Sequence, residues 1–265
     1  MKIVENGEPT QGEQAYRQLR RMIVDCELAP GSSVSEPELT QLLGLGKAAV
    51  RAALLRLSHD GFVTAVPRYG YRVAALDIKD ALELTQLRLL TEPSAYRLAT
   101  GRLAPAVIEL ARKRYAAGYD RNNARSVTRY LTQSREFKRA VAQASGNRRL
   151  AAWVEEVSER IDRYLRVSAM TSDLSPTIAS NLLPLCDAML NGQEEEAELL
   201  ARNNILAVTA RLLSALFPHE NSTDFFSSGD VASMLGLQLR EAQSGKQVAA
   251  DRPGASMGRR PRTGS

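Results

Sequence analysis

Between residues 35 and 59 the sequence places two helical signals close together, with a glycine turn between them. Ser35, followed by a Glu three positions later, forms a capping box that predicts a helix from Glu36 to Leu43. Two glycines within the next three residues break that helix. An apolar stripe at helical spacing then predicts a second helix from Lys47 to His59. The pattern indicates a helix-turn-helix unit.

Two short β-type runs follow this unit. Phe62–Val66 and Tyr71–Ala74 flank Pro67-Arg68-Tyr69-Gly70, which predicts a hairpin with a glycine in its turn. Upstream, apolar residues on one face predict a further helix, which we expect Pro30-Gly31 to end. We therefore expect residues 13–75, called the head below, to form a winged helix-turn-helix.

The segment from 77 to 218, called the body below, contains almost no strand signal and is rich in Leu, Ala, Arg and Glu. Its long periodic segments predict a bundle of six or seven helices. The expected breaks between helices are Pro93, Pro105, Gly146-Asn147, Pro176, Pro184 and Gly192. The predicted fold class is mostly α: an N-terminal winged helix-turn-helix, α with a small β-hairpin, plus a C-terminal all-helical bundle.

The two ends carry weaker signals. Residues 1–12 form a polar arm, and residues 219–265 form a C-terminal extension with one amphipathic helical pattern around Val231. Beyond Ser244 the extension is rich in Gly, Ser, Pro and Arg, so we expect it to be partly disordered. The cluster Arg259-Arg260-Pro261-Arg262 could contact DNA non-specifically or simply be solvated.

Composition excludes several classes of protein. The chain of 265 residues has only two Cys and two His, which argues against a disulfide framework and a Cys/His zinc site. No signal peptide or membrane-length apolar run is present, so we expect a cytoplasmic protein with no membrane partner. The net charge of +5 fits a nucleic-acid partner and simple solubility equally well. No cluster of nucleophile, base or phosphate-binding loop suggests an enzyme.

The second helix of the helix-turn-helix has the chemistry of a DNA reader. Lys47 and Arg51 lie four residues apart near its N-terminal end, from which Arg and Lys can reach guanine O6 and N7 in the major groove. Alternatively, the pair is a solvated helix edge, but the wing that follows favours DNA. The candidate DNA-binding residues are Ser35, Lys47, Arg51, Arg68, Tyr69, Gly70 and Arg72.

These residues carry a resemblance to a known family. The stretch from Ala29 to Arg51, together with Arg68-Tyr69-Gly70, resembles the winged helix of the GntR superfamily of bacterial regulators. The resemblance implies that Lys47 and Arg51 read bases and that Gly70 is the wing-tip glycine. Gly46 stands where the family usually has Ser or Thr, and Ala52 where it has Glu. The missing Glu leaves open how Arg51 is braced and which operator it reads.

The body is similar to the FCD effector domain of the FadR-like branch of that superfamily. The similar segments are Leu87–Glu92, Arg135–Phe137, Ala144–Asn147 and Asn191-Gly192. By this resemblance the body binds a small-molecule effector and dimerises. A homodimer would read a pseudo-palindromic operator in double-stranded DNA, because its two heads would read half-sites about one helical turn apart.

The resemblance also exposes a missing metal site. The family's four metal-ligand positions, an Asp and three His, correspond here to Ser134, Lys138, Leu182 and Asn204. A Lys ammonium would repel a dication, so we expect no metal and no cofactor.

We expect instead that Lys138, with Arg88 and Asn204, binds an anionic or polar molecule directly. Two alternatives remain open. Lys138 could point to solvent, and Arg88 could pair with Glu92 at i+4.

The sequence therefore predicts a sequence-specific transcription regulator, usually a repressor in this family, whose DNA affinity responds to a small effector such as an organic acid. The alternative is a DNA-binding regulator with a degenerate effector domain, either constitutive or controlled by a protein partner. An enzyme is the third class, and the residues needed for one are missing.

Overall fold

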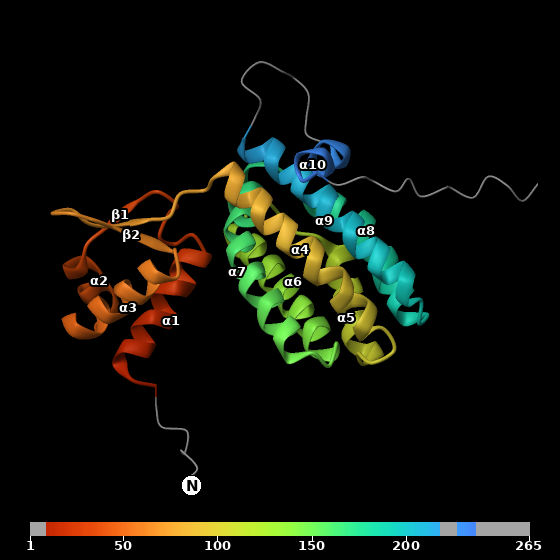
Figure 1. Cartoon of the computed structure of the whole chain (residues 1–265), viewed down its shortest axis with the longest axis horizontal. Helices are drawn as coiled ribbons and strands as arrows, with labels where there is room; N and C mark the ends of the chain where they lie inside the picture. The colour runs from red at the N-terminus through yellow and green to blue at the C-terminus, as the bar shows by residue number, and fades with distance from the viewer. Residues whose placement is uncertain (1–8, 218–226, 237–265) are drawn as a thin grey trace, which may run out of the picture.

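The computed structural model describes residues 9–217 and 227–236. Figure 1 shows two lobes, with the head joined to the body by the segment between β3 and α4. The head contains α1 (Gln11–Val24), β1 (Ser33–Val34), α2 (Glu36–Leu43), α3 (Lys47–His59), β2 (Val63–Val66) and β3 (Gly70–Val73). The body contains α4 (Ile78–Ala99), α5 (Pro105–Ala117), α6 (Ala124–Ala144), α7 (Arg148–Thr171), α8 (Ser175–Leu190), α9 (Glu194–Leu216) and α10 (Ser228–Met234).

The helix-turn-helix forms where the sequence predicts it, with both helices at the predicted bounds. The Ser35 hydroxyl accepts a hydrogen bond from the Glu38 backbone N–H, and the Ser35 backbone N–H donates to the Glu38 carboxylate at 3.0 Å. This reciprocal cap satisfies two of the donors left free at the start of α2. Gly44 ends α2 in the left-handed conformation, at φ 65°, which turns the chain into α3.

The head closes around its own apolar core and a three-stranded antiparallel sheet of order β1-β3-β2. The predicted hairpin is present, with Val63 opposite Val73. The sequence does not predict β1, since two residues are too short to show a period, and it becomes a strand only by pairing with β3.

One boundary in the head was predicted wrongly. Helix α1 ends at Val24, six residues before Pro30-Gly31. Cys26 turns the chain at φ 55°, and the Asp25 and Cys26 backbone N–H groups complete the helix end on Arg21 and Ile23 carbonyls. A helix end built from a local reversal of this kind leaves no Gly or Pro in the sequence to mark it.

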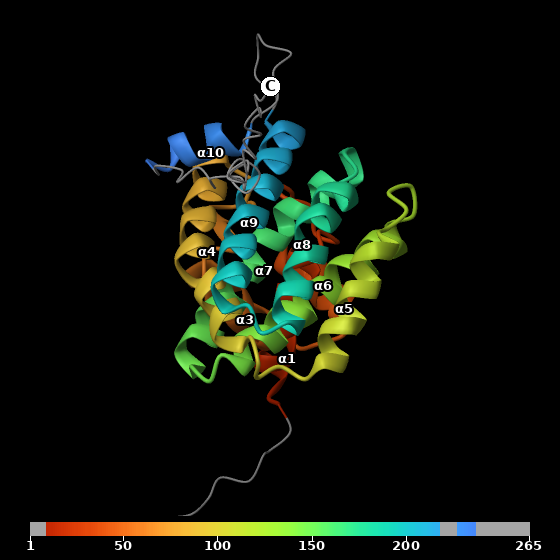
Figure 2. The same ribbon diagram turned by 90° about the vertical axis from the view of Figure 1, so that its right-hand side faces the viewer.

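The body is a helical bundle, as predicted, and Figures 1 and 2 show α4 and α9 side by side. Two predicted breaks are wrong, because Pro93 lies inside α4 and Pro184 inside α8. A proline removes one backbone hydrogen bond from a helix. Pro93 is buried in the bundle, and packing against the other helices keeps α4 helical despite that loss. Pro105 and Pro176 lie in the first turns of their helices and Asn147 caps α7, in agreement with the predicted breaks.

Other expectations met different outcomes. Of the two large aromatic residues on α7, Trp153 is 54% exposed and Tyr164 is buried. In the extension, α10 packs against α9 through the buried Val231. Most of the polar arm and the Arg259 cluster lie outside the described residues. None of the helices described is long and apolar enough to cross a bilayer.

Helix α7 of the body holds the head through several contacts. Arg160 donates a hydrogen bond of 2.8 Å to the Asp60 carbonyl, and Arg163 donates to the Ala74 carbonyl. Arg166 forms an ion pair of 2.8 Å with Asp25. The orientation of the head therefore depends on consecutive turns of one body helix.

Candidate nucleic-acid interface and effector site

The N-terminal end of α3 is open to solvent and to anions. Gly46 caps the helix without a side-chain hydrogen bond, so backbone N–H groups of the first turn remain available. Lys47 is exposed beside them, while Val50 and Leu54 are buried against the head core. A helix N-terminus with a lysine next to it attracts phosphate, and α3 presents both away from its packed face.

Arg51 is held by a carboxylate from the preceding helix. Its Nε and Nη2 atoms donate to Glu36 at 3.1 and 2.8 Å, while the Arg51 side chain stays 65% exposed. The hydrogen bond from Arg51 holds the pKa of Glu36 below its usual value. Glu36 thus supplies a brace for Arg51 in a chain that has Ala52 where the resembling family has Glu.

The wing tip exposes Arg68 and Tyr69, with Tyr69 78% exposed. Arg68 has φ 68° after Pro67, the arrangement of a type II turn. Arg72 is also exposed, on β3 between the buried Tyr71 and Val73. Figure 1 shows the hairpin extending away from the body. The predicted DNA-binding side chains of the wing are therefore accessible.

The structure requires a glycine at position 70, independently of any contact with DNA. Gly70 lies at φ 94°, and a Cβ there would come within 2.6 Å of the Val34 carbonyl oxygen. The glycine is required by the close approach of β1 and β3, whatever the wing contacts outside the protein.

Arg88 and Glu92 form a buried ion pair within α4. Arg88 Nε lies 2.6 Å and Nη2 3.3 Å from the two carboxylate oxygens of Glu92. Burial opposes the charge on Glu92, but Arg88 and Lys138 outweigh it, so the pKa of Glu92 lies below its usual value. Arg88 Nη1 is buried and has no hydrogen-bond partner within the described part of the chain.

Lys138 does not point to solvent, so that alternative is wrong. Its Nζ lies 3.8 Å from Oδ1 of Asp162, and both side chains are buried. Arg135 reaches the other oxygen of the same carboxylate at 3.4 Å. Burial raises the pKa of Asp162 above its usual value, although Lys138 and Arg135 both act to lower it.

The remaining predicted effector residues lie in different surroundings. Ser134 shares a hydrogen bond of 3.2 Å with the hydroxyl of Tyr115, and Leu182 is buried in the bundle core. The Oδ1 atom of Asn204 is buried without a partner among the described residues. Within those residues no group of three or more His, Cys, Asp or Glu is placed to hold a metal ion.

Asp162 is not among the site residues predicted from the sequence. The signal was present, because Asp162 lies next to Ile161 and one turn after Ser158 on the buried side of the amphipathic helix α7. A carboxylate at such a position needs a cationic partner inside the protein.

Comparisons with known proteins agree with both halves of this architecture. Residues 11–73 match the family described as bacterial regulatory proteins, gntR family, and residues 83–207 match the FCD domain. The Nta operon transcriptional regulator of Aminobacter aminovorans is 31% identical over 145 residues, covering 55% of this chain and 68% of its own. The HTH-type transcriptional repressor RspR of Escherichia coli is 32% identical over 105 residues, covering 34% and 46%.

A solved structure shows the same fold. The crystal structure of a transcriptional regulator GntR from Rhodococcus sp. RHA1 superposes with a TM-score of 0.63 at 23% identity, covering 78% of this chain and 99% of its own. The matched families and relatives are transcription regulators and not enzymes, as the sequence predicted.

Proposed function

Because the chain belongs to the GntR family of bacterial transcription regulators and carries an FCD domain, we propose that it is a homodimeric, effector-controlled repressor. Residues 13–75 bind the operator, and residues 77–218 bind the effector and dimerise. The name of the relative RspR supports repression. The protein works in the cytoplasm, where chromosomal DNA lies. The observation that carries the proposal is the exposed, braced Arg51 beside the open end of α3.

DNA reading divides between two kinds of contact. Arg51 and Lys47 reach base edges in the major groove, and Arg51 arrives already held in one orientation by Glu36. Arg68, Tyr69 and Arg72 contact the backbone or the minor groove from the wing.

The two roles give different results in fluorescence anisotropy titrations. Arg51→Ala lowers operator affinity and leaves affinity for random DNA nearly unchanged. Arg72→Ala weakens both DNAs alike and reduces the salt slope by about one. Arg125→Ala, an exposed arginine at the start of α6, is the control and changes neither. If Arg51→Ala weakens both DNAs equally, α3 is not the reading helix.

The dimer forms through the outer face of α4. Leu87, Leu90 and Leu98 lie on one side of this helix and are exposed, Leu90 by 69%. Leu199 of the neighbouring α9 is also exposed. Leucines grouped on adjacent helices suit a second copy of the same surface, since a two-fold axis brings each stripe against itself.

The effector site lies between α4, α6 and α9. Arg88 Nη1 is a buried donor and Asn204 Oδ1 a buried acceptor, and both lack partners in the described chain. An unpaired buried polar atom costs about 1–3 kcal/mol, and a bound molecule would remove that cost. An organic acid whose carboxylate accepts from Arg88, and which also carries a hydroxyl or amino donor for Asn204, fits this pair of atoms. Lys138 adds positive charge nearby.

A specific observation favours a second candidate, a regulator with a body that senses no small molecule. Glu92 and Asp162 already neutralise Arg88 and Lys138. Titration calorimetry with hydroxy and amino acids on wild type, Lys138→Ala and Asn204→Ala separates the two. Saturable binding that both variants weaken supports the effector site. Absence of heat for every acid, with DNA binding intact, supports the second candidate.

A further inference from the structure

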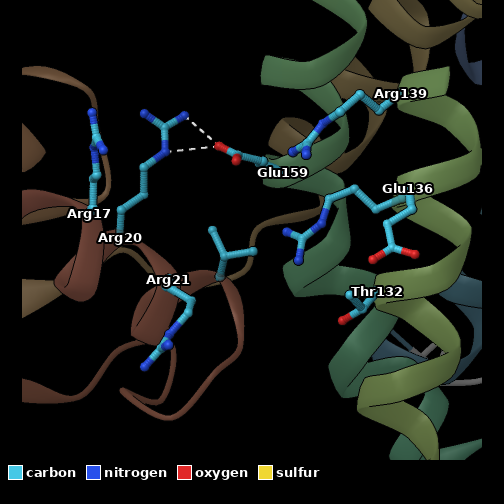
Figure 3. A pocket seen from close by; sticks show the side chains of 9 residues that line it. Arg17, Arg20, Arg21, Thr132, Glu136, Arg139 and Glu159 are labelled. Carbon is cyan, nitrogen blue, oxygen red and sulfur yellow. Dashed lines mark hydrogen bonds and ion pairs between the residues drawn. The ribbon is translucent and has the colours of Figure 1, made fainter. Parts of the chain in front are cut away.

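A cleft of about 330 Å³ separates the head from the body. Helix α1 forms one wall, and α6 and α7 form the other (Figure 3). Five arginines line it: Arg17, Arg20 and Arg21 from α1, and Arg135 and Arg139 from α6. Its acidic lining residues are Glu136 and Glu159. We refer to it as the arginine cleft.

The arginines are spaced so that like charges meet. Arg17 and Arg21 lie four residues apart on α1, and Arg135 and Arg139 four apart on α6. Like charges at this spacing destabilise a helix. The two pairs line opposite walls of the same cleft, so their charges oppose the docking of head on body.

The protein's own carboxylates neutralise this charge only in part. Arg20 crosses the cleft to Glu159 at 2.7 Å, the contact drawn in Figure 3. Arg139 pairs with Glu155 and Arg17 with Glu13, both exposed to solvent. Arg21 has no ion-pair partner among residues 9–217 and 227–236. Arg135 pairs with Asp162, so four of the five arginines have a carboxylate partner, and the cleft retains the unpaired charge of Arg21.

We propose that the arginine cleft binds a small polyanion that bridges α1 of the head to α6 of the body. Guanidinium groups from both walls match the paired oxygens of phosphate or carboxylate. The volume lies near the lower end of the range for small-molecule sites, roughly 300–1,000 Å³. DNA is not the occupant, because α1 faces the body here and the wing extends to the far side of the head (Figure 1).

One carboxylate links a residue of the cleft to a residue in the interior of the body. Arg135 lines the cleft and contacts Asp162, which also holds the buried Lys138. An anion that draws Arg135 toward the cleft leaves Lys138 as the remaining partner of Asp162. The anion would thus change both the orientation of the head and the charge of the interior site. This consequence for DNA binding rests on the proposed function, whereas the anion site itself does not.

Titration calorimetry on the full chain without DNA, at fixed ionic strength, tests the site. Inorganic triphosphate and citrate are the two probes, and the tighter of them identifies a phosphoryl or a carboxylate ligand. Arg21→Gln should weaken binding by about fivefold, which corresponds to about 1 kcal/mol. The double variant Arg21→Gln/Arg139→Gln should weaken binding by more than about twentyfold, which corresponds to about 1.8 kcal/mol. Arg21 has no partner to lose, so its substitution leaves folding intact.

One control completes the design. Arg125→Gln removes an exposed arginine of α6 outside the cleft and should bind the probe as wild type does. Absence of binding by either probe overturns the site, and so does binding that Arg21→Gln and the double variant leave unchanged. Failure of the proposed function would show instead as loss of operator binding, in a separate assay.

Discussion

Lys138 and Arg135, one turn apart on α6, share the buried carboxylate of Asp162, at 3.8 and 3.4 Å. Asp162 lies on α7 directly before Arg163, which contacts the head. The buried carboxylate of the body and a residue that contacts the head therefore lie in the same turn of α7. A ligand that moved this turn would therefore also move the contact of Arg163 with the head.

Replacing Lys138 by Met should destabilise the body most at neutral pH. The change leaves Asp162 buried with Arg135 as its remaining close cation, and breaking a buried pair costs about 3–5 kcal/mol. Thermal denaturation at pH 7 should show a clear fall in Tm relative to wild type.

The pH dependence of the Lys138→Met variant follows from Asp162. Its pKa is already raised in the folded protein by burial, and removing Lys138 raises it further. The stability that comes from the protonated form is fully present below the ordinary Asp pKa and is lost as pH rises through the folded value. The deficit of the variant should thus shrink as pH falls. A deficit that is constant with pH would show that Lys138 acts through packing alone.

Glu36→Gln should change DNA specificity in a direction opposite to its effect on general affinity. The substitution removes the brace on Arg51 and also removes a negative charge near the DNA phosphates. We expect weaker discrimination between operator and random DNA, with affinity for random DNA raised. Gel-shift titrations on both DNAs measure the ratio. Discrimination equal to that of wild type would mean that Arg51 needs no brace.

Gly70→Ala should destabilise the head more than Gly31→Ala. Both glycines have positive φ, at 94° and 78°. Only at Gly70 would the added Cβ meet a backbone atom, at 2.6 Å, whereas at Gly31 nothing lies within 4 Å. Strained backbone alone costs about 1–3 kcal/mol. Equal losses in Tm would show that the contact between β1 and β3 relaxes without cost.

Leu90→Glu should convert the proposed dimer to a monomer and weaken operator binding in parallel. A charge at the most exposed leucine of α4 would be buried against its copy in the proposed interface. Sedimentation velocity measures the mass. Met170→Glu, at another exposed apolar residue, is the matched control and should sediment as wild type does. A dimer that persists in Leu90→Glu places the interface elsewhere.

Local signals predicted the head well because its helices begin and end on capping residues and glycines close in sequence, such as Ser35 and Gly44. Features that depend on contacts between distant parts of the chain could not be predicted from the sequence. The strand at Val34 exists only through β3, and Pro93 stays helical within a packed bundle. The pairing of Lys138 with Asp162 joins residues of two helices, so spacing along the sequence could not reveal it.

We propose above all that the head reads a specific DNA sequence through Arg51. The most direct test incubates the purified protein with sheared genomic DNA from its source, sequences the retained fragments, and runs Arg51→Ala in parallel. We expect wild type to enrich a short pseudo-palindrome and the variant not to do so. Uniform retention by wild type that vanishes at moderate salt would leave only phosphate attraction, and would contradict the claim.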